Sequence, residues 1–152
     1  MEFKKKMESP QETHSSEKII LVIDDNRDQL FLSKTVLEIQ DYKVYTALGG
    51  NDSFDLLNRI PQPDLILLDM QMQDMSGPEF LLQLEKTRPE IYENVPVVFF
   101  TAMDRVPESK AVGFIQKLGD FDKFLGAVRG FIEKGSGRAK WTQSKTISIP
   151  GT

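Results

Sequence analysis

Residues 64–70, which read Asp-Leu-Ile-Leu-Leu-Asp-Met, decide the fold class of this chain. Four consecutive aliphatic residues between acids are typical of a short strand that is buried on both faces, as the strands of a parallel sheet are. Asp69 then lies at the carboxyl end of that strand, the edge at which open α/β sheets bind their ligands. This segment alone leaves two interpretations equally open: Asp69 either takes part in chemistry, or lies in a loop or caps a helix.

Three other apolar runs have the same form, because each is followed by a polar residue suited to chemistry. They are Ile19–Ile23 before Asp24 and Asp25, Pro96–Phe100 before Thr101, and Ala111–Ile115 before Lys117. Each predicts a further buried strand. The alternation of polar and apolar residues in Lys43–Ala47 predicts an edge strand.

Segments with helical periodicity separate these strands. They are Leu30–Ile39, Asn51–Ile60, Gly77–Arg88 and Phe121–Ile132. Ser76 and Glu79 stand at the spacing of a capping box with Pro78 in the first turn, and Asp120 is a candidate N-cap. The alternation of strands and helices predicts an α/β fold, a doubly wound five-stranded parallel sheet with right-handed crossovers. All the strands then end at one edge, which brings the polar residues that follow them together.

Length and composition bound the class of protein. A chain of 152 residues with 39% hydrophobic and 28% charged residues fits one ordinary globular domain. The net charge of −4 argues against general binding to nucleic acid or anionic membranes. The absence of cysteine excludes disulfides, thiolate catalysis and cysteine-based zinc sites. No apolar segment follows the three lysines at residues 4–6, so we expect neither a signal peptide nor a membrane anchor, and a cytoplasmic location.

The two ends of the chain differ from its middle. Residues 1–17 are polar and aperiodic, and residues 135–152 are rich in Gly, Ser and Thr and basic, so both are predicted to be flexible tails around a domain at residues 18–134. His14, the only histidine, lies in the first tail and is expected to be solvated and incidental. No output domain follows residue 134, so we expect a domain that acts alone.

The acids predicted at the sheet edge need a positive partner. Two carboxylates 4 Å apart repel by about 4 kcal/mol at an effective dielectric constant of 20. Carboxylate oxygens suit a hard cation, and Mg²⁺ fits a site with few protein carboxylates, while Lys117 can neutralise further charge. An ionised aspartate is also a nucleophile for phosphoryl transfer, in which positioning and charge neutralisation supply most of the catalysis. With the Thr101 hydroxyl nearby, we infer that an aspartyl phosphate forms on Asp69.

These residues together resemble a bacterial response-regulator receiver domain of the chemotaxis-receiver type. The resemblance rests on four motifs and covers about residues 18–134: Ile20–Asn26, Leu67–Met70 with Met72, Gly77 and Glu79 downstream, Phe99–Ala102, and Gly113–Lys117. It implies the flavodoxin-like receiver fold, with strand order 2-1-3-4-5. It also implies that Asp69 accepts phosphate from a histidine kinase or a histidine phosphotransfer protein.

The resemblance implies further roles, each carried over to the matching position. Asp25 would bind Mg²⁺ directly and Asp24 mainly through water, with Asp69 and the backbone carbonyl of Gln71 completing the protein ligands. Thr101 and Lys117 would contact the phosphoryl group, and Phe114 would be the switch aromatic that follows Thr101. Gln71 and Met103 flank the expected path of hydrolytic water, and are candidates for tuning the lifetime of the phosphate.

The chain departs from the family pattern at three places. Leu118 and Gln73 stand where family members usually have proline. Because a cis bond before a residue other than proline costs about 3 kcal/mol or more, a trans bond is favoured after Lys117. Only sixteen positions separate Thr101 from Lys117, which predicts a shortened fourth helix and an altered surface there.

The residues leave three possible functions open, each from a different class of protein. The first is a stand-alone receiver that is no conventional enzyme, exists as a monomer or weak homodimer, and signals to an unknown downstream protein by phosphorylation-dependent contact. The second is a receiver-like interaction module that acts without phosphorylation, suggested by Leu118 and the short fourth-helix region. The third is a phosphatase of the haloacid-dehalogenase type, which generally needs an acid where Gln71 stands. A flavin-binding protein is disfavoured because the acids after the first strand would repel a phosphate.

Overall fold

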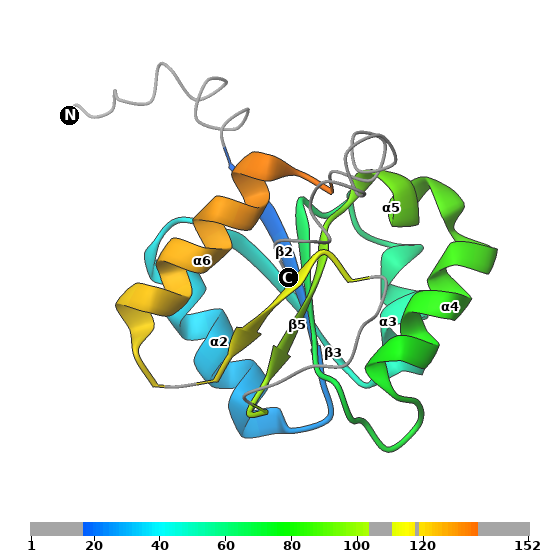
Figure 1. Ribbon diagram of the computed structural model, residues 1–152, viewed down its shortest axis with the longest axis horizontal. Coiled ribbons are helices and arrows are strands. Elements are labelled where there is room, and N and C mark those ends of the chain that lie inside the picture. The colour runs from blue at the N-terminus through cyan, green and yellow to red at the C-terminus, as the bar shows by residue number, and fades with distance from the viewer. Residues whose placement is uncertain (1–16, 104–110, 118, 137–152) are drawn as a thin grey trace, which may run out of the picture.

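The computed structural model describes residues 17–103, 111–117 and 119–136, and has a sheet between two layers of helices (Figure 1). The elements in chain order are β2 (Ile19–Asp24), α2 (Arg27–Ile39), β3 (Lys43–Leu48), α3 (Gly50–Leu57), β4 (Leu65–Leu68), α4 (Gly77–Thr87), α5 (Pro89–Asn94), β5 (Val97–Thr101), β6 (Gly113–Gln116) and α6 (Phe121–Lys134). No helix in these described ranges is long and apolar enough to cross a membrane.

The sheet has the predicted topology. Its five strands are all parallel, in the order β3-β2-β4-β5-β6, which is 2-1-3-4-5 when the strands are counted along the chain. β3 lies at one edge, as its alternating sequence predicted. Ile23 in β2 pairs with Leu68 in β4. The acids that follow these two residues therefore leave the sheet at the same level.

The aliphatic run of β4 is buried because helices cover both faces of the sheet (Figure 1). Leu65 and Leu67 point to the core beneath α2 and α6, whereas Ile66 and Leu68 point to the core beneath α3, α4 and α5. Successive strand residues face opposite sides, so a central strand with two covered faces needs apolar residues at every position. This requirement explains why all four residues of β4 are aliphatic.

Side-chain caps mark the starts of three helices, and two of these caps, the Ser76–Glu79 box and Asp120, were predicted from the sequence. Asn26 caps α2 by accepting the N–H of Gln29 at 3.0 Å. Ser76 and Glu79 form a complete capping box at the start of α4, with side chain and backbone bonded in both directions. Asp120 caps α6 through its side chain. Each cap satisfies backbone donors that have no partner inside the helix, and so fixes where the helix leaves the sheet edge.

Some boundaries differ from the prediction. α5 was not predicted, because its segment is polar and begins with a proline. Proline is favoured in the first turn of a helix, however, and the buried side chains of Ile91 and Tyr92 anchor this short helix to the core. α3 ends at Leu57 rather than Ile60, and β6 begins at Gly113 rather than Ala111. Three predictions fall mostly outside the described residues: the short fourth helix expected within residues 102–110, of which 104–110 are not described, the Lys117–Leu118 bond, and nearly all of the two tails.

Candidate functional site

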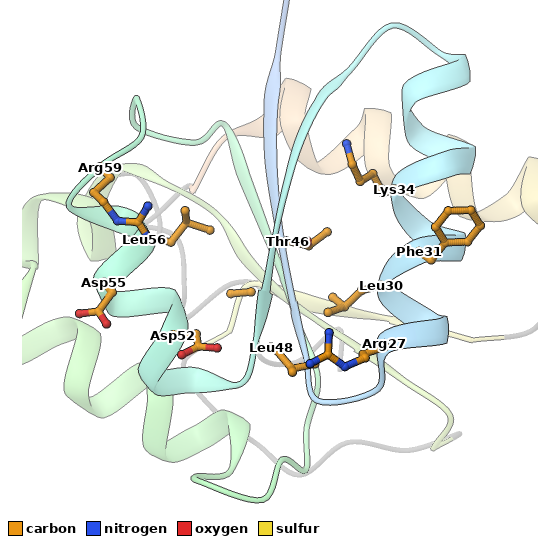
Figure 2. A pocket seen from close by; sticks show the side chains of 11 residues that line it. Arg27, Leu30, Phe31, Lys34, Thr46, Leu48, Asp52, Asp55, Leu56 and Arg59 are labelled. Atoms are coloured by element: carbon orange, nitrogen blue, oxygen red, sulfur yellow. The ribbon is translucent and has the colours of Figure 1, made fainter.

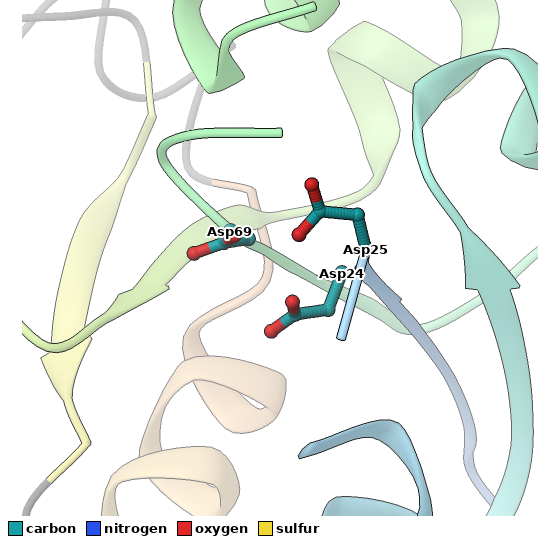
Figure 3. Close-up of side chains that lie close together, drawn as sticks. All are labelled: Asp24, Asp25 and Asp69. Atoms are coloured by element: carbon teal, nitrogen blue, oxygen red, sulfur yellow. The ribbon is translucent and has the colours of Figure 1, made fainter. Parts of the chain in front are cut away.

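Three carboxylates meet at the carboxyl edge of the sheet. Asp24 is the last residue of β2, Asp25 follows it, and Asp69 follows β4. Figure 3 shows the three side chains converging, and one carboxylate oxygen of each lies within 4.8 Å of the others. The backbone N–H of Asp69 donates to the carbonyl of Ile23 at 2.9 Å, which holds the two strand ends side by side. The predicted acid cluster is therefore present.

Lys117 reaches this cluster from the end of β6. Its Nζ lies 2.8 Å from Oδ2 of Asp24 and 3.6 Å from Oδ1 of Asp69. The ammonium also lies over the ring of Phe100, 5.3 Å from the centroid, where cation–π attraction adds to the ion pairs. Lysine is thus in position although Leu118, not proline, follows it.

The electrostatics of the cluster favour a bound cation. The pKa of the Asp69 carboxyl is raised from its usual value of 3.8 to about 6; burial is the largest cause, the Lys117 ammonium opposes it, and Asp24 and Asp25 add to the rise. One ammonium does not balance three carboxylates. A set of oxygen donors with excess negative charge is the environment that Mg²⁺ binds, so these residues fit that ion.

Two further predicted site residues, Thr101 and Phe114, lie on the neighbouring strands β5 and β6. Thr101 is buried at the end of β5, where its hydroxyl accepts the N–H of Met103 at 3.1 Å and its carbonyl accepts the N–H of Lys117 at 2.7 Å. Phe114 in β6 pairs in register with Phe99, and its side chain is 41% exposed. In this structure the hydroxyl of Thr101 is thus engaged within its own loop, and the aromatic ring of Phe114 faces outward.

The loop after β4 contributes contacts that sequence reasoning missed. We call residues 71–76 the β4–α4 loop. The main-chain N–H of Gln73 donates to Oδ2 of Asp25 at 2.9 Å. The side chain of Asp74 accepts the N–H groups of Gly50 at 3.2 Å and Asn51 at 2.8 Å, at the start of α3. The one available signal was the pair of glycines at the start of α3, Gly49 at the N-cap and Gly50 as the first helical residue, because Gly49 gives the helix no side-chain cap.

The charge of Asp74 is stabilised by these contacts. Burial raises the pKa of its carboxyl, but hydrogen bonds from backbone N–H groups, those of Asn51 and Gly50 foremost, more than offset this and leave the pKa below its usual value. An anion at a helix N-terminus also interacts favourably with the helix dipole. Asp74 therefore supplies, from a distant point in the chain, the side-chain acceptor that Gly49 at the N-cap position of α3 lacks.

Gly77 brings the start of α4 against the site. Its N–H donates to the carbonyl of Met70 at 2.7 Å. A Cβ at this position would lie 2.6 Å from the ring of Phe99 and 2.9 Å from the carbonyl oxygen of Asp69. Any larger residue would displace one of these groups, so the glycine permits the close approach of α4 to the backbone of Asp69.

Two hollows lie near this edge of the fold. One, of about 610 Å³, lies between α2 and α3 over β3 and is lined by charges of both signs, among them Arg27, Lys34, Asp52 and Asp55 (Figure 2). It does not include the carboxylate cluster. The other, of about 150 Å³, includes Lys117 and lies between α2 and the start of α6. None of the three carboxylates lines either of these two hollows.

The chain is similar to known proteins both in sequence and in fold. Residues 20–129 match the family model of the response regulator receiver domain. The chain is 30% identical over 119 residues to sporulation initiation phosphotransferase F of Bacillus subtilis, covering 74% of this chain and 92% of that protein. It is 28% identical over 121 residues to the transcriptional regulatory protein GlrR of Escherichia coli, covering 76% of this chain but only 26% of that longer protein. Among solved structures, the response regulator protein TrrA of Thermotoga maritima in complex with Mg²⁺-BeF has a TM-score of 0.64 and 26% identity, over 74% of this chain and 97% of that one.

Proposed function

The chain belongs to the family of response-regulator receiver domains of two-component systems, and from that premise we propose that Asp69 accepts a phosphoryl group from a histidine kinase or a histidine phosphotransfer protein. The observation that carries this proposal is the placement of the Asp69 carboxylate beside Asp24, Asp25 and the Lys117 ammonium. Receiver domains are signalling domains rather than conventional enzymes, so the product is the modified protein itself. We infer that it signals by protein contact in the cytoplasm.

The transfer is a nucleophilic displacement at phosphorus. An oxygen of Asp69 forms the new bond to phosphorus while the bond to the donor's imidazole nitrogen breaks, and that nitrogen keeps the electron pair. Asp24, Asp25, Asp69 and the backbone carbonyl of Gln71 would hold Mg²⁺. When bound, the ion supplies positive charge that neutralises the phosphoryl oxygens.

The residues around Asp69 stabilise the charge that it acquires. Lys117 lies between Asp24 and Asp69, so a small movement of its flexible side chain brings the ammonium to a phosphoryl oxygen. The Thr101 hydroxyl would exchange its bond from Met103 for one to the same group, and Phe114 would move inward behind it. Phosphorylation thereby favours one of two existing conformations and changes the surface that a downstream protein contacts. Gln71 and Met103 remain our candidates for tuning the lifetime of the phosphate.

The hollow beside Lys117 suits the protein that delivers the phosphoryl group. The apolar side chains of Leu32 in α2 and Phe121 in α6 line it and are 44% and 45% exposed. Exposed apolar residues around a reactive edge are typical of a protein contact surface. The phosphodonor would therefore contact α2 and the start of α6 while its phosphohistidine reaches Asp69.

Phosphorylation of the full chain by a small donor tests the function. We would incubate the protein with Mg²⁺ and acetyl phosphate and record its intact mass. The wild type and an Asp28→Asn control, which removes an exposed acid of α2, should each gain one phosphoryl group. Asp69→Asn should gain none. An adduct that persists in Asp69→Asn, or no adduct on the wild type, would contradict the proposal.

A further inference from the structure

The β4–α4 loop is held to its surroundings on both sides. Its Gln73 N–H donates to the carboxylate of Asp25, and the adjacent Asp74 accepts two N–H groups at the start of α3. Two neighbouring residues thus connect the exposed acid of the cluster to a helix on the far side of the loop. Neither contact takes part in the chemistry described above.

The Gln73 bond fixes an otherwise mobile ligand. Asp25 is the exposed member of the cluster, and its side chain can rotate about two bonds. The N–H of Gln73 holds Oδ2 at 2.9 Å, and Oδ1 takes no part in this bond. The donor is a main-chain group, and proline has none. This contact therefore exists only because residue 73 is not proline.

Asp74 holds the loop in the position that the hydrogen bond from Gln73 to Asp25 requires. α3 begins with Gly49 as N-cap, which provides no side-chain acceptor, and Asp74 supplies the missing carboxylate. Met75 adds a packing contact, since a Cβ at Gly50 would lie 2.5 Å from its sulfur. The loop is thereby fixed on the α3 side, with the N–H of the preceding residue, Gln73, directed at Asp25.

We propose that the main-chain N–H of residue 73 is a positioning group for Asp25 that prepares the acidic cluster for a divalent cation, and that Asp74 keeps this N–H in place. The inference rests on the proposed cation site. Metal-ligating carboxylates are themselves commonly hydrogen-bonded, and losing such an outer partner typically weakens metal binding by about 10- to 100-fold. Here that partner comes from the backbone and acts on a single oxygen of Asp25.

Titration of the full chain with Mg²⁺, followed by calorimetry, distinguishes the effect of the residue 73 N–H on Mg²⁺ binding from the effect of its side chain. Gln73→Pro should raise the dissociation constant for Mg²⁺ about 10-fold or more, because it removes the donor. Gln73→Ala keeps the N–H and should bind as the wild type does. Asp74→Ala should weaken binding less than Gln73→Pro, whereas Asp52→Asn, in the first turn of α3, should leave it unchanged.

Amide hydrogen exchange in Mg²⁺-free wild type provides a second reading that does not depend on the proline variant. The Gln73 amide should exchange more slowly in the wild type than in Asp25→Ala. Equal exchange rates, or equal Mg²⁺ affinities for Gln73→Pro and Gln73→Ala, would overturn the positioning role while leaving the cation site intact. A wild type that binds no Mg²⁺ would instead contradict the proposed function, and the positioning role with it.

Discussion

The strand β4 and the loop that follows it are held in place by different means. β4 is fixed by apolar side chains that are buried on both faces of the sheet, and its position places Asp69 at the edge. The β4–α4 loop is exposed over much of its length, and hydrogen bonds from Gln73 and Asp74 hold it. Hydrophobic burial therefore places the reactive residue, and a few polar contacts orient the groups around it.

The largest expected effect comes from the strand. Ile66→Ala removes a fully buried side chain from the centre of the sheet and should lower the free energy of unfolding by about 2–5 kcal/mol. Leu82→Ala, at an exposed position of α4, should change it by only about 0.5 kcal/mol. Urea denaturation measures both. Similar losses for the two variants would show that the strand is not the main source of stability.

Asp69 should carry an unfavourable charge when no cation is present. The pKa of its carboxyl is raised to about 6 in the folded chain, so the unfolded chain ionises first as the pH rises. Stability is then lost between the unfolded value near 3.8 and the folded value near 6, and stays lower above it. In Mg²⁺-free buffer at pH 7, Asp69→Asn should therefore be more stable than wild type by about 2 kcal/mol, with no gain below about pH 4.

The comparison of Asp69→Asn with wild type is checked with a control variant and with added Mg²⁺. Asp28→Asn should show little change at either pH. Saturating Mg²⁺ should reduce the advantage of Asp69→Asn, because the ion stabilises the wild-type carboxylate. If Asp69→Asn were less stable than wild type at pH 7 without Mg²⁺, the description of the cluster as an excess of negative charge would be wrong.

Gly77 lies where the strand and the loop meet. Gly77→Ala places a methyl group 2.9 Å from the Asp69 carbonyl oxygen and should cost about 1–3 kcal/mol in unfolding free energy. Gly126→Ala is the matched control, since a Cβ at this position in α6 meets nothing within 4 Å. That change should stabilise the chain by about 0.5–1 kcal/mol. Thermal denaturation distinguishes the opposite signs.

The smallest effect belongs to the contact between the loop and α3. Asp74→Asn keeps a side-chain acceptor but removes the negative charge at the start of α3, and should lower the free energy of unfolding at pH 7 by about 1 kcal/mol or less. The pKa of Asp74 is lower in the folded chain, so its contribution is present above the unfolded pKa near 3.8 and is lost as the pH falls through the folded pKa. The two proteins should therefore converge in stability in acid. A constant difference across that range would exclude a charged cap.

The sequence predicted the sheet and the cluster because both follow from side-chain patterns. The run in β4 requires two covered faces, and the parallel topology then brings Asp24, Asp25, Asp69 and Lys117 to one edge. Lys117 reaches the cluster even though Leu118 replaces the family's usual proline. Its place is set by pairing of β6 with β5, which the pattern of apolar residues already indicated.

The loop contacts were beyond prediction for a physical reason. The Gln73 donor is a main-chain group, which every residue except proline has, so no residue type marks it. The Asp74 contact joins segments more than twenty residues apart, and its partners are also main-chain N–H groups. α5 was missed because its segment is mostly polar, and its two buried side chains, Ile91 and Tyr92, form no recognisable apolar pattern. Contacts made by the backbone become visible only once the fold has placed them.

Direct localisation of the phosphoryl group tests the central claim, that burial of β4 places Asp69 to receive it. After incubation with Mg²⁺ and acetyl phosphate, reduction with borohydride converts an aspartyl phosphate to homoserine, which peptide mass spectrometry then locates. We predict homoserine at position 69 alone, and none when Mg²⁺ or the donor is omitted. Homoserine at position 24 or 25, or at no position in a folded sample, would contradict the account.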